Sequence, residues 1–211
     1  MHNSNIGIKR IRKNLISLEK NPVIQLKKLQ KYSGQKANPR FLSSEQQGRD
    51  TLFFAKKGFQ VHALDYSENA VEAISQKAQK LGLSQSITAV RHDIRKPLPF
   101  ADGSFDACYC HMLYCMALCT SELESLFQEV RRVLKPKGLN IYTVRHTGDA
   151  HYRKGIHRGE DIYEVEGFIV HFFSKEKVEH LAKGYEIISI DEFEEGELPR
   201  KLFIVVLRKE A

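Results

Sequence analysis

GRDTLFFAKKGFQVHALDYSENAVE (residues 48–72) is the stretch that decides the fold. Its first ten residues, 48–57, have the composition of a short helix, and an apolar strand follows at residues 59–64. After Asp65 the spacing of apolar residues changes to that of a helix, which we expect to run over residues 68–81. A strand between two helices is typical of βαβ units, which build a parallel sheet covered by helices.

The same alternation continues on both sides of this stretch. Further strands are expected at residues 40–44, 87–91, 105–110 and 139–145, and an amphipathic helix at residues 121–134. After a helix from Ser174 to about Lys183, strands at 185–193 and 202–208 are joined by a loop short enough for antiparallel pairing. We therefore predict an α/β fold with a doubly wound, Rossmann-like, mostly parallel sheet and an antiparallel terminal strand pair.

Composition places the chain in a broad class. Its 211 residues suit one α/β domain, and no apolar run reaches the roughly 18–20 residues that span a bilayer. The basic first 20 residues lack the apolar centre of a secretory signal, so we expect a cytoplasmic location. The four cysteines crowd between Cys108 and Cys119 without the paired short spacings of a zinc site. We interpret them as packing residues and predict no metal site.

Positive charge gathers at the start of the chain. Residues 1–40 contain ten Lys or Arg and one acidic residue, Glu19, whereas the whole chain has a net charge of +7. We therefore divide the chain into a basic N-terminal segment at 1–38, helical or partly disordered, and a domain at 39–211. Such a segment could touch nucleic acid or an anionic surface, although a solvated arm is the interpretation we favour.

Three stretches carry a resemblance to a known family. They are residues 47–72, residues 91–110 and LFQEVRRVLKPKG at 126–138, where a helix ends in Leu-Lys-Pro-x-Gly before a strand. In this order they resemble the class I S-adenosylmethionine-dependent methyltransferases, from about Arg40 to the end of the chain. The branch they resemble most is that of small-molecule methyltransferases of the tellurite-resistance type. The resemblance implies S-adenosylmethionine as cofactor and methyl transfer to a small-molecule acceptor.

The resemblance also implies where the cofactor binds. Doubly wound sheets bind ligands beyond the carboxyl ends of their strands. Asp65, followed by Tyr66, would accept the ribose hydroxyls, although Asp65 could instead cap the next helix. Asp93 and Ile94 fall where the family holds adenine, although Asp93 could be a simple turn residue. His111 would face the meeting point of methionine and acceptor, with a packing role as the alternative.

The first strand and its loop depart from the family. The family pattern there is acid-x-Gly-x-Gly-x-Gly, and the matching positions are Leu42, Ser44, Gln46 and Gly48. Gly48 is retained, and glycine at such a turn allows positive φ and close approach to a ligand. The carboxylate that would reach toward the amino end of the cofactor is missing. Altered cofactor binding and an error in the sequence are two interpretations; a third is a non-catalytic methyltransferase-like protein that acts as a binding or assembly module.

Residues 146–171 form a polar segment, rich in Gly and His, where the family builds its acceptor pocket. We expect a long loop over the cofactor crevice, with Arg145, His146 and His171 as candidate substrate residues and a histidine as candidate proton acceptor. A solvated loop is the alternative. The fourth strand ends Cys-His-Met-Leu and lacks the Asp/Asn-Pro-Pro-aromatic motif of amino-group nucleic-acid methyltransferases. A nucleic-acid substrate is therefore not expected, and the sequence indicates neither a catalytic residue nor an oligomeric state.

Overall fold

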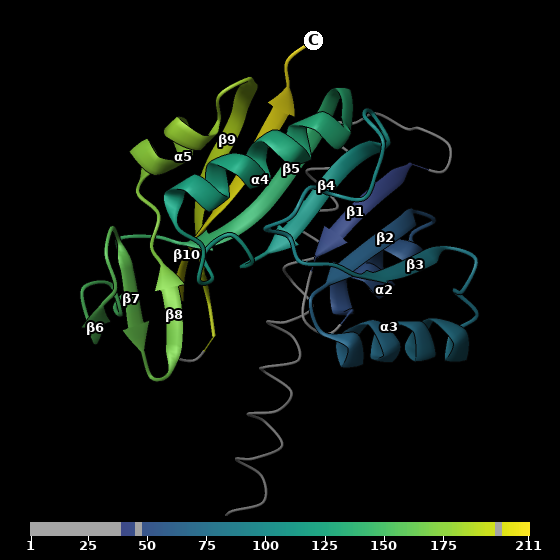
Figure 1. Ribbon diagram of the computed structural model, residues 1–211, viewed down its shortest axis with the longest axis horizontal. Helices are drawn as coiled ribbons and strands as arrows, with labels where there is room; N and C mark the ends of the chain where they lie inside the picture. Colours follow the sequence, from purple (N-terminus) through teal and green to yellow (C-terminus); the bar gives the residue numbers. More distant parts are fainter. Residues whose placement is uncertain (1–38, 45–47, 197–199) are drawn as a thin grey trace, which may run out of the picture.

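A seven-stranded mixed sheet runs through the computed structural model, in the order β3-β2-β1-β4-β5-β10-β9 (Figure 1). The structure describes residues 39–44, 48–196 and 200–211. The basic segment predicted at 1–38 lies outside the described residues, as does Gln46. Within the described parts of the chain, no helix is both long and apolar enough to cross a membrane.

Five neighbouring strands of the sheet are parallel, and the last two strands of the chain are antiparallel to β5 and to each other. This confirms the predicted doubly wound sheet with an antiparallel terminal pair. The parallel strands are β1 (Arg40–Ser44), β2 (Gln60–Asp65), β3 (Ile87–Arg91), β4 (Phe105–His111) and β5 (Leu134–Arg145); the antiparallel strands are β9 (Tyr185–Glu195) and β10 (Arg200–Lys209).

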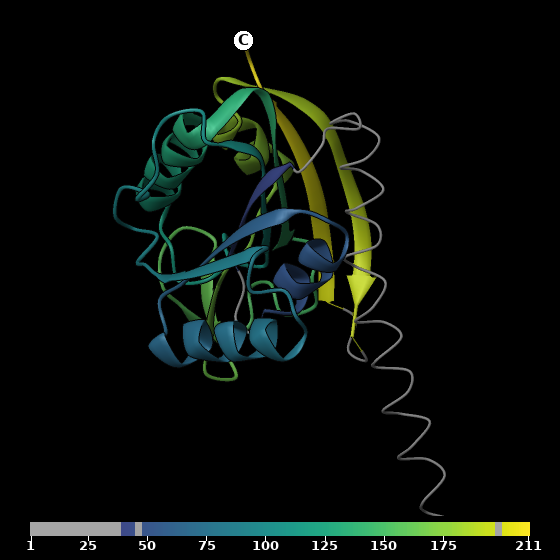
Figure 2. The ribbon, with the colours of Figure 1, turned by 90° about the vertical axis from the view of Figure 1, so that its right-hand side faces the viewer.

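Helices cover both faces of the sheet. One apolar cluster joins the sheet to α2 (Arg49–Lys56) and α3 (Glu68–Lys80), and a second joins it to α4 (Thr120–Val133) and α5 (Lys175–Leu181). Figure 2 shows α2 and α4 on opposite sides of the strands. Because both faces are covered, β4 is buried over six consecutive residues, which is typical of a parallel sheet.

Local signals fix the helix starts. The Ser67 side chain accepts a hydrogen bond from the Ala70 N–H (3.4 Å) and so caps α3. At α4, the Glu122 carboxylate accepts from the N–H of Cys119, the residue before the helix (2.9 Å). Reciprocal contacts of this kind satisfy N–H groups that have no partner inside the helix.

The segment 146–171 is not the long loop that we expected. It contains a three-stranded antiparallel sheet of β6 (Ile156–His157), β7 (Ile162–Val165) and β8 (Phe168–His171). The turn between β7 and β8 has two residues, Glu166 and Gly167, both with positive φ (53° and 81°), which is the geometry favoured in hairpins. The strands span only two to four residues each, so apolar alternation could not reveal them.

This small sheet is attached at the carboxyl end of the parallel strands. The Phe173 N–H donates to the carbonyl of Arg145, the last residue of β5 (2.9 Å), and the His171 N–H donates to the carbonyl of Cys115, in the loop after β4 (3.0 Å). The segment therefore lies on the side of the sheet where doubly wound folds bind ligands.

Candidate functional site

Strand order reverses between β1 and β4, because the chain runs outward from β1 through β2 to β3 and then returns to place β4 on the other side of β1. Doubly wound sheets bind their ligands at this reversal, outside the carboxyl ends of the strands. Asp65 ends β2 and His111 ends β4, while Gly48 precedes α2, the helix that follows β1. The structure thus places these three predicted residues at ends of elements along one edge.

Gly48 has a backbone conformation that other residues rarely adopt. Its φ of 71° lies in the left-handed region, directly before the first turn of α2. A Cβ added there would lie 2.6 Å from Cγ1 of Ile74, on α3. Glycine is therefore required both by the turn and by the close packing of this turn against α3.

Asp65, the residue predicted to bind the ribose, accepts a hydrogen bond within the turn that follows β2. Its Oδ1 accepts a hydrogen bond from the Ser67 N–H (2.8 Å). Burial raises the pKa of Asp65 and the Ser67 hydrogen bond partly opposes this shift. The next side chain, Tyr66, is 65% exposed. An aromatic ring therefore stands in solvent beside a half-buried carboxylate at this strand end.

Asp93 lies in the loop after β3 and is held by a neighbour. Its Oδ1 accepts from Arg95 Nε (2.9 Å) and its Oδ2 from Arg95 Nη2 (2.8 Å). The hydrogen bonds from the Arg95 side chain are the main reason that the pKa of Asp93 is lowered to about 2. Ile94 is partly buried and packs against the apolar cluster under α4. The loop thus places one charged and one apolar side chain together, beside the ends of β2 and β3.

His111 belongs to a hydrogen-bonded chain of three side chains. The N–H of Met112, the residue after β4, donates to Thr143 Oγ1 (3.1 Å), and Thr143 Oγ1 lies 2.8 Å from His111 Nδ1. A carboxylate can only accept, so the contact of 3.4 Å between Glu195 Oε2 and His111 Nε2 is best matched by a hydrogen on Nε2. Thr143 can then accept from Met112 and donate its own hydrogen to Nδ1.

Glu195 is a site residue that sequence reasoning missed. It is the last residue of β9, and its side chain is 4% exposed. Burial alone would favour the neutral acid, but His111, Arg200 and Arg49 outweigh burial and hold the pKa of Glu195 below its usual value. Nothing in the stretch Glu192-Phe193-Glu194-Glu195 distinguishes this glutamate from its neighbours, so the sequence offered no signal for it.

Arg145 and His146, at the end of β5, are held by the surrounding fold. Arg145 Nη2 donates to Asp149 Oδ1 (2.6 Å), and the guanidinium lies 5.2 Å from the ring centre of Phe172. The His146 ring stacks on Phe203 with centroids 4.4 Å apart, and burial lowers the pKa of His146. These partners fix both side chains in place, and their role in substrate binding stays a prediction.

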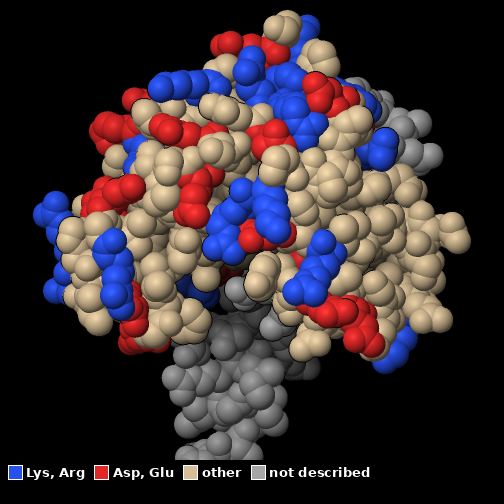
Figure 3. Space-filling model, in the orientation of Figure 1, with Lys and Arg blue, Asp and Glu red and all other residues tan. Residues whose placement is uncertain are grey.

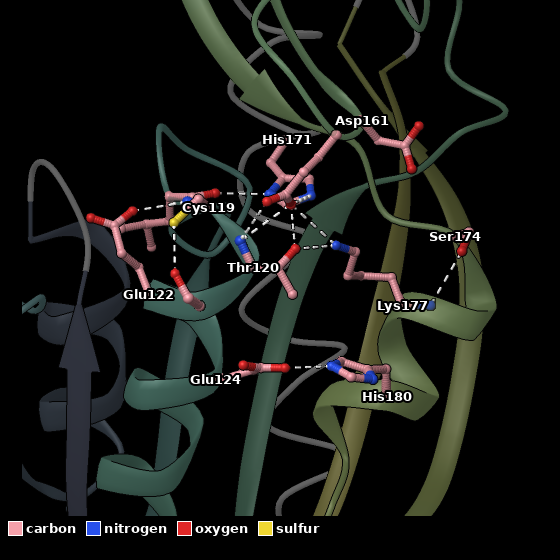
Figure 4. A network of polar contacts seen from close by, with 12 residues as sticks. Cys119, Thr120, Glu122, Glu124, Asp161, His171, Ser174, Lys177 and His180 are labelled. Carbon is pink, nitrogen blue, oxygen red and sulfur yellow. Dashed lines mark hydrogen bonds and ion pairs between the residues drawn. The ribbon is translucent and has the colours of Figure 1, made fainter.

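His171, at the end of β8, lies in a separate polar network (Figure 4). Its side chain is fully buried; Nδ1 donates to the Leu118 carbonyl (2.8 Å) and Nε2 lies 3.5 Å from Glu160 Oε2. Glu160 also accepts from the Thr120 N–H (3.2 Å) and lies 3.4 Å from Lys177 Nζ. Burial lowers the pKa of His171. The network joins the small sheet to the first residues of α4 and α5.

The cysteines are packing residues in the structure. Cys108, Cys110 and Cys115 are buried and none forms a disulfide. Burial raises the pKa of Cys108 to about 12 and that of Cys115 to about 11, so these thiols stay protonated at neutral pH. Among the described residues, no group of three or more His, Cys, Asp or Glu side chains is arranged to hold a metal ion.

Comparison with protein families matches residues 46–138 to the methyltransferase domain. A putative methyltransferase of Bacillus subtilis is 36% identical over 99 residues, which cover 46% of this chain and 38% of that protein. A sterol 24-C-methyltransferase of Gibberella zeae is 39% identical over 82 residues, which cover 39% of this chain and 20% of that protein. The chain thus spans less than two fifths of the length of each of these two relatives. Identity over such partial spans describes the domain and not the whole of those proteins.

Solved structures share the fold over most of the chain. A S-adenosylmethionine-dependent methyltransferase of Methanosarcina mazei has a TM-score of 0.70 at 21% identity, covering 86% of this chain and 96% of that one. The 1,6-didemethyltoxoflavin-N1-methyltransferase of Burkholderia thailandensis, solved with 1,6-didemethyltoxoflavin and S-adenosylhomocysteine bound, has a TM-score of 0.72 at 14% identity, covering 96% and 82%. TehB of Haemophilus influenzae has a TM-score of 0.63 at 16% identity, covering 82% and 58%. The chain therefore has the fold of the class I S-adenosylmethionine-dependent methyltransferases, and its residues 46–138 match the model of the methyltransferase domain.

Proposed function

We propose that this protein transfers a methyl group from S-adenosylmethionine to a small-molecule acceptor. The observation that carries the proposal is the alignment of Gly48, Asp65 and His111 with the strand-order reversal, inside the segment that matches the methyltransferase domain. A non-catalytic binding or assembly role remains the competing function. It would be favoured if the folded protein bound no cofactor.

The side chains at this edge fit the parts of the cofactor. Ribose hydroxyls need acceptors, and Asp65 offers a half-buried carboxylate at the end of β2. Adenine needs an apolar surface and an acceptor for its amino group, which Ile94 and Asp93 provide in the next loop. The left-handed turn at Gly48 permits a close approach of backbone to ligand, and the exposed Tyr66 ring adds an aromatic surface beside the ribose position.

When bound, S-adenosylmethionine supplies a methyl group on a sulfonium centre that is activated for in-line displacement. The main contribution of the protein is then to align the acceptor with that methyl group and to exclude water. The Thr143–His111–Glu195 chain suits this work because it fixes the orientation of the imidazole at the end of β4. His111 Nε2 faces the carboxylate of Glu195 at 3.4 Å and is therefore placed to donate to it.

A small acceptor is the substrate class that the surroundings support best. The Burkholderia neighbour was solved with a small heterocycle bound, and the small sheet of residues 156–171 stands beside the end of β5. On the face shown in Figure 3, basic and acidic side chains are intermingled, in contrast to the continuous basic surfaces that bind nucleic acid. Arg145, His146 and His171 stay candidates for acceptor binding, and the domain at 39–211 and the cytoplasmic location stay predictions.

Cofactor binding tests the proposal directly. Isothermal titration of the full chain with S-adenosylhomocysteine should show saturable binding, and Asp65→Asn should weaken it about tenfold or more, because a hydrogen bond to a charged acceptor is worth about 1.5–3 kcal/mol. Asparagine keeps an acceptor for the Ser67 N–H, so the turn survives the substitution. Asp102→Asn, at a side chain 81% exposed in an ion pair with Arg132, is the matched control and should bind as the wild type does. A folded wild-type protein that binds no S-adenosylhomocysteine would overturn the proposal.

A further inference from the structure

Glu195 is a buried carboxylate at the end of an edge strand. β9 is an edge strand, and its neighbouring acidic residues Glu192 and Glu194 are exposed to water. The Glu195 side chain is 4% exposed, although a buried carboxylate is costly unless charged partners surround it. The structure supplies such partners in His111 Nε2 (3.4 Å) and Arg200 Nη2 (3.8 Å).

These contacts locate Glu195 at the point where strand order reverses. His111 is the last residue of β4, and Arg49, whose charge also acts on Glu195, is the first residue of α2 after β1. The C-terminal hairpin therefore brings a carboxylate from the edge strand to the end of β4, at the strand-order reversal. Asp65, at the end of β2, stands on the other side of β1.

The chemistry of the proposed cofactor matches this arrangement. One end of the ligand is a nucleoside and the other is an α-amino acid, which carries an ammonium and a carboxylate group. With its ribose at Asp65, a ligand extended across the end of β1 would place its amino-acid end on the β4 side. There Glu195 presents an anionic group, the complement of the ammonium, beside the charge of Arg49, whose guanidinium also donates to Asp50 (2.9 Å).

We propose that Glu195 binds the ammonium group of the amino-acid end of the cofactor. Thr143 and His111 orient the carboxylate of Glu195 for this contact. The inference rests on the proposed function. It also bears on Leu42, which stands where the family carries an acid: Leu42 is 3% exposed and part of the apolar core. In this chain the anionic group would come from the last residue of β9, on the opposite side of β4, and not from β1.

The affinities of two proteins for two ligands, compared in all four combinations, measure the contact between Glu195 and the ammonium group. The proteins are the full-length wild type and Glu195→Gln, which has the same shape and can still accept from His111. The ligands are S-adenosylhomocysteine and its deaminated analogue 5′-S-(3-carboxypropyl)-5′-thioadenosine, which lacks only the ammonium group. The wild type should bind S-adenosylhomocysteine about tenfold or more tightly than the analogue, and Glu195→Gln should bind the two ligands about equally. Glu194→Gln, a neutralised exposed neighbour, should discriminate as the wild type does.

The outcomes separate this inference from the function on which it rests. A wild type that binds both ligands equally, or a folded Glu195→Gln protein that still discriminates, overturns the role of Glu195 and leaves methyl transfer standing. A folded wild type that binds neither ligand overturns the proposed function and this inference with it. If Glu195→Gln does not fold, Glu195→Asp keeps the charge on a shorter side chain. It should lose part of the discrimination, and full discrimination by this variant would contradict the proposal.

Discussion

At the scale of single residues, Gly48 is constrained by two separate physical causes, its φ of 71° and the 2.6 Å separation that an added Cβ would have from Ile74. We expect Gly48→Ala to lower the free energy of unfolding by about 2–4 kcal/mol, because a left-handed non-glycine costs about 1–3 kcal/mol and the overlap adds to it. Urea denaturation followed by circular dichroism would measure the change.

Gly58→Ala separates the two causes. Gly58 also has a positive φ (87°), but a Cβ there would meet no atom within 4 Å. This control should cost only the backbone term, about 1–3 kcal/mol, without the added overlap. Equal losses in the two variants would show that contact with Ile74 adds nothing at Gly48.

At the scale of elements, Glu160 connects the small sheet of β6, β7 and β8 to α4 and α5 through Thr120, Lys177 and His171. Glu160→Ala should let the small sheet open more often, because it removes the contacts to Thr120 and Lys177 and leaves the backbone hydrogen bonds and the His171–Leu118 hydrogen bond. We expect the amides of these three strands to exchange about tenfold faster, which corresponds to about 1.4 kcal/mol of local opening. Hydrogen exchange read by mass spectrometry would measure this.

Glu166→Ala is the control in the same sheet, since Glu166 lies in the exposed turn between β7 and β8. It should leave the exchange of the small sheet nearly unchanged. Faster exchange of β4 and β5 in Glu160→Ala would contradict the prediction, because the effect would then be global unfolding and not release of one element.

Elements with long apolar patterns could be predicted from the sequence, and others could not. The bounds of β1 and β3 were predicted as 40–44 and 87–91 and agree with the structure, although β1 has only two apolar residues in its sequence RFLSS. The placement of Asp65 and His111 at one edge of the sheet could also be predicted, because residues that end parallel strands meet at one edge. Their roles in binding stay predictions. β6 to β8 were missed because strands of two to four residues leave no periodic pattern. Glu195 was missed because its place at the crevice depends on the path of a whole hairpin.

At the scale of the whole molecule, several histidines respond to acid in the same direction. Burial is the main cause that lowers the pKa of His62, His146 and His171 in the folded protein. As pH falls below about 6.5, the unfolded chain takes up these protons before the folded protein does. Folding stability should therefore decrease between about pH 6.5 and 5. Carboxylates with lowered pKa values, such as Asp93 and Glu195, cause their main loss of stability below about pH 5.

Urea denaturation at pH 7.5, 6 and 5 would test this dependence. His171→Asn, which can keep the donor to the Leu118 carbonyl, should cost about 1–3 kcal/mol at pH 7.5 and should lose less stability than the wild type on going to pH 5. The remaining dependence would belong to His62 and His146. A wild-type stability that stays constant or rises toward pH 5 would show that these histidines are not held neutral by the fold.

The position of β10 between β5 and β9 also affects how the protein is made on the ribosome. The five parallel strands are complete once residue 145 has been synthesised, but β5 gains its antiparallel partner only after residue 200. At the usual elongation rates of about 5–20 residues per second, the edge of β5 that later pairs with β10 has no strand partner for several seconds. An open edge of this kind can pair with other nascent chains, so chaperone protection matters most while residues 146–209 are being synthesised.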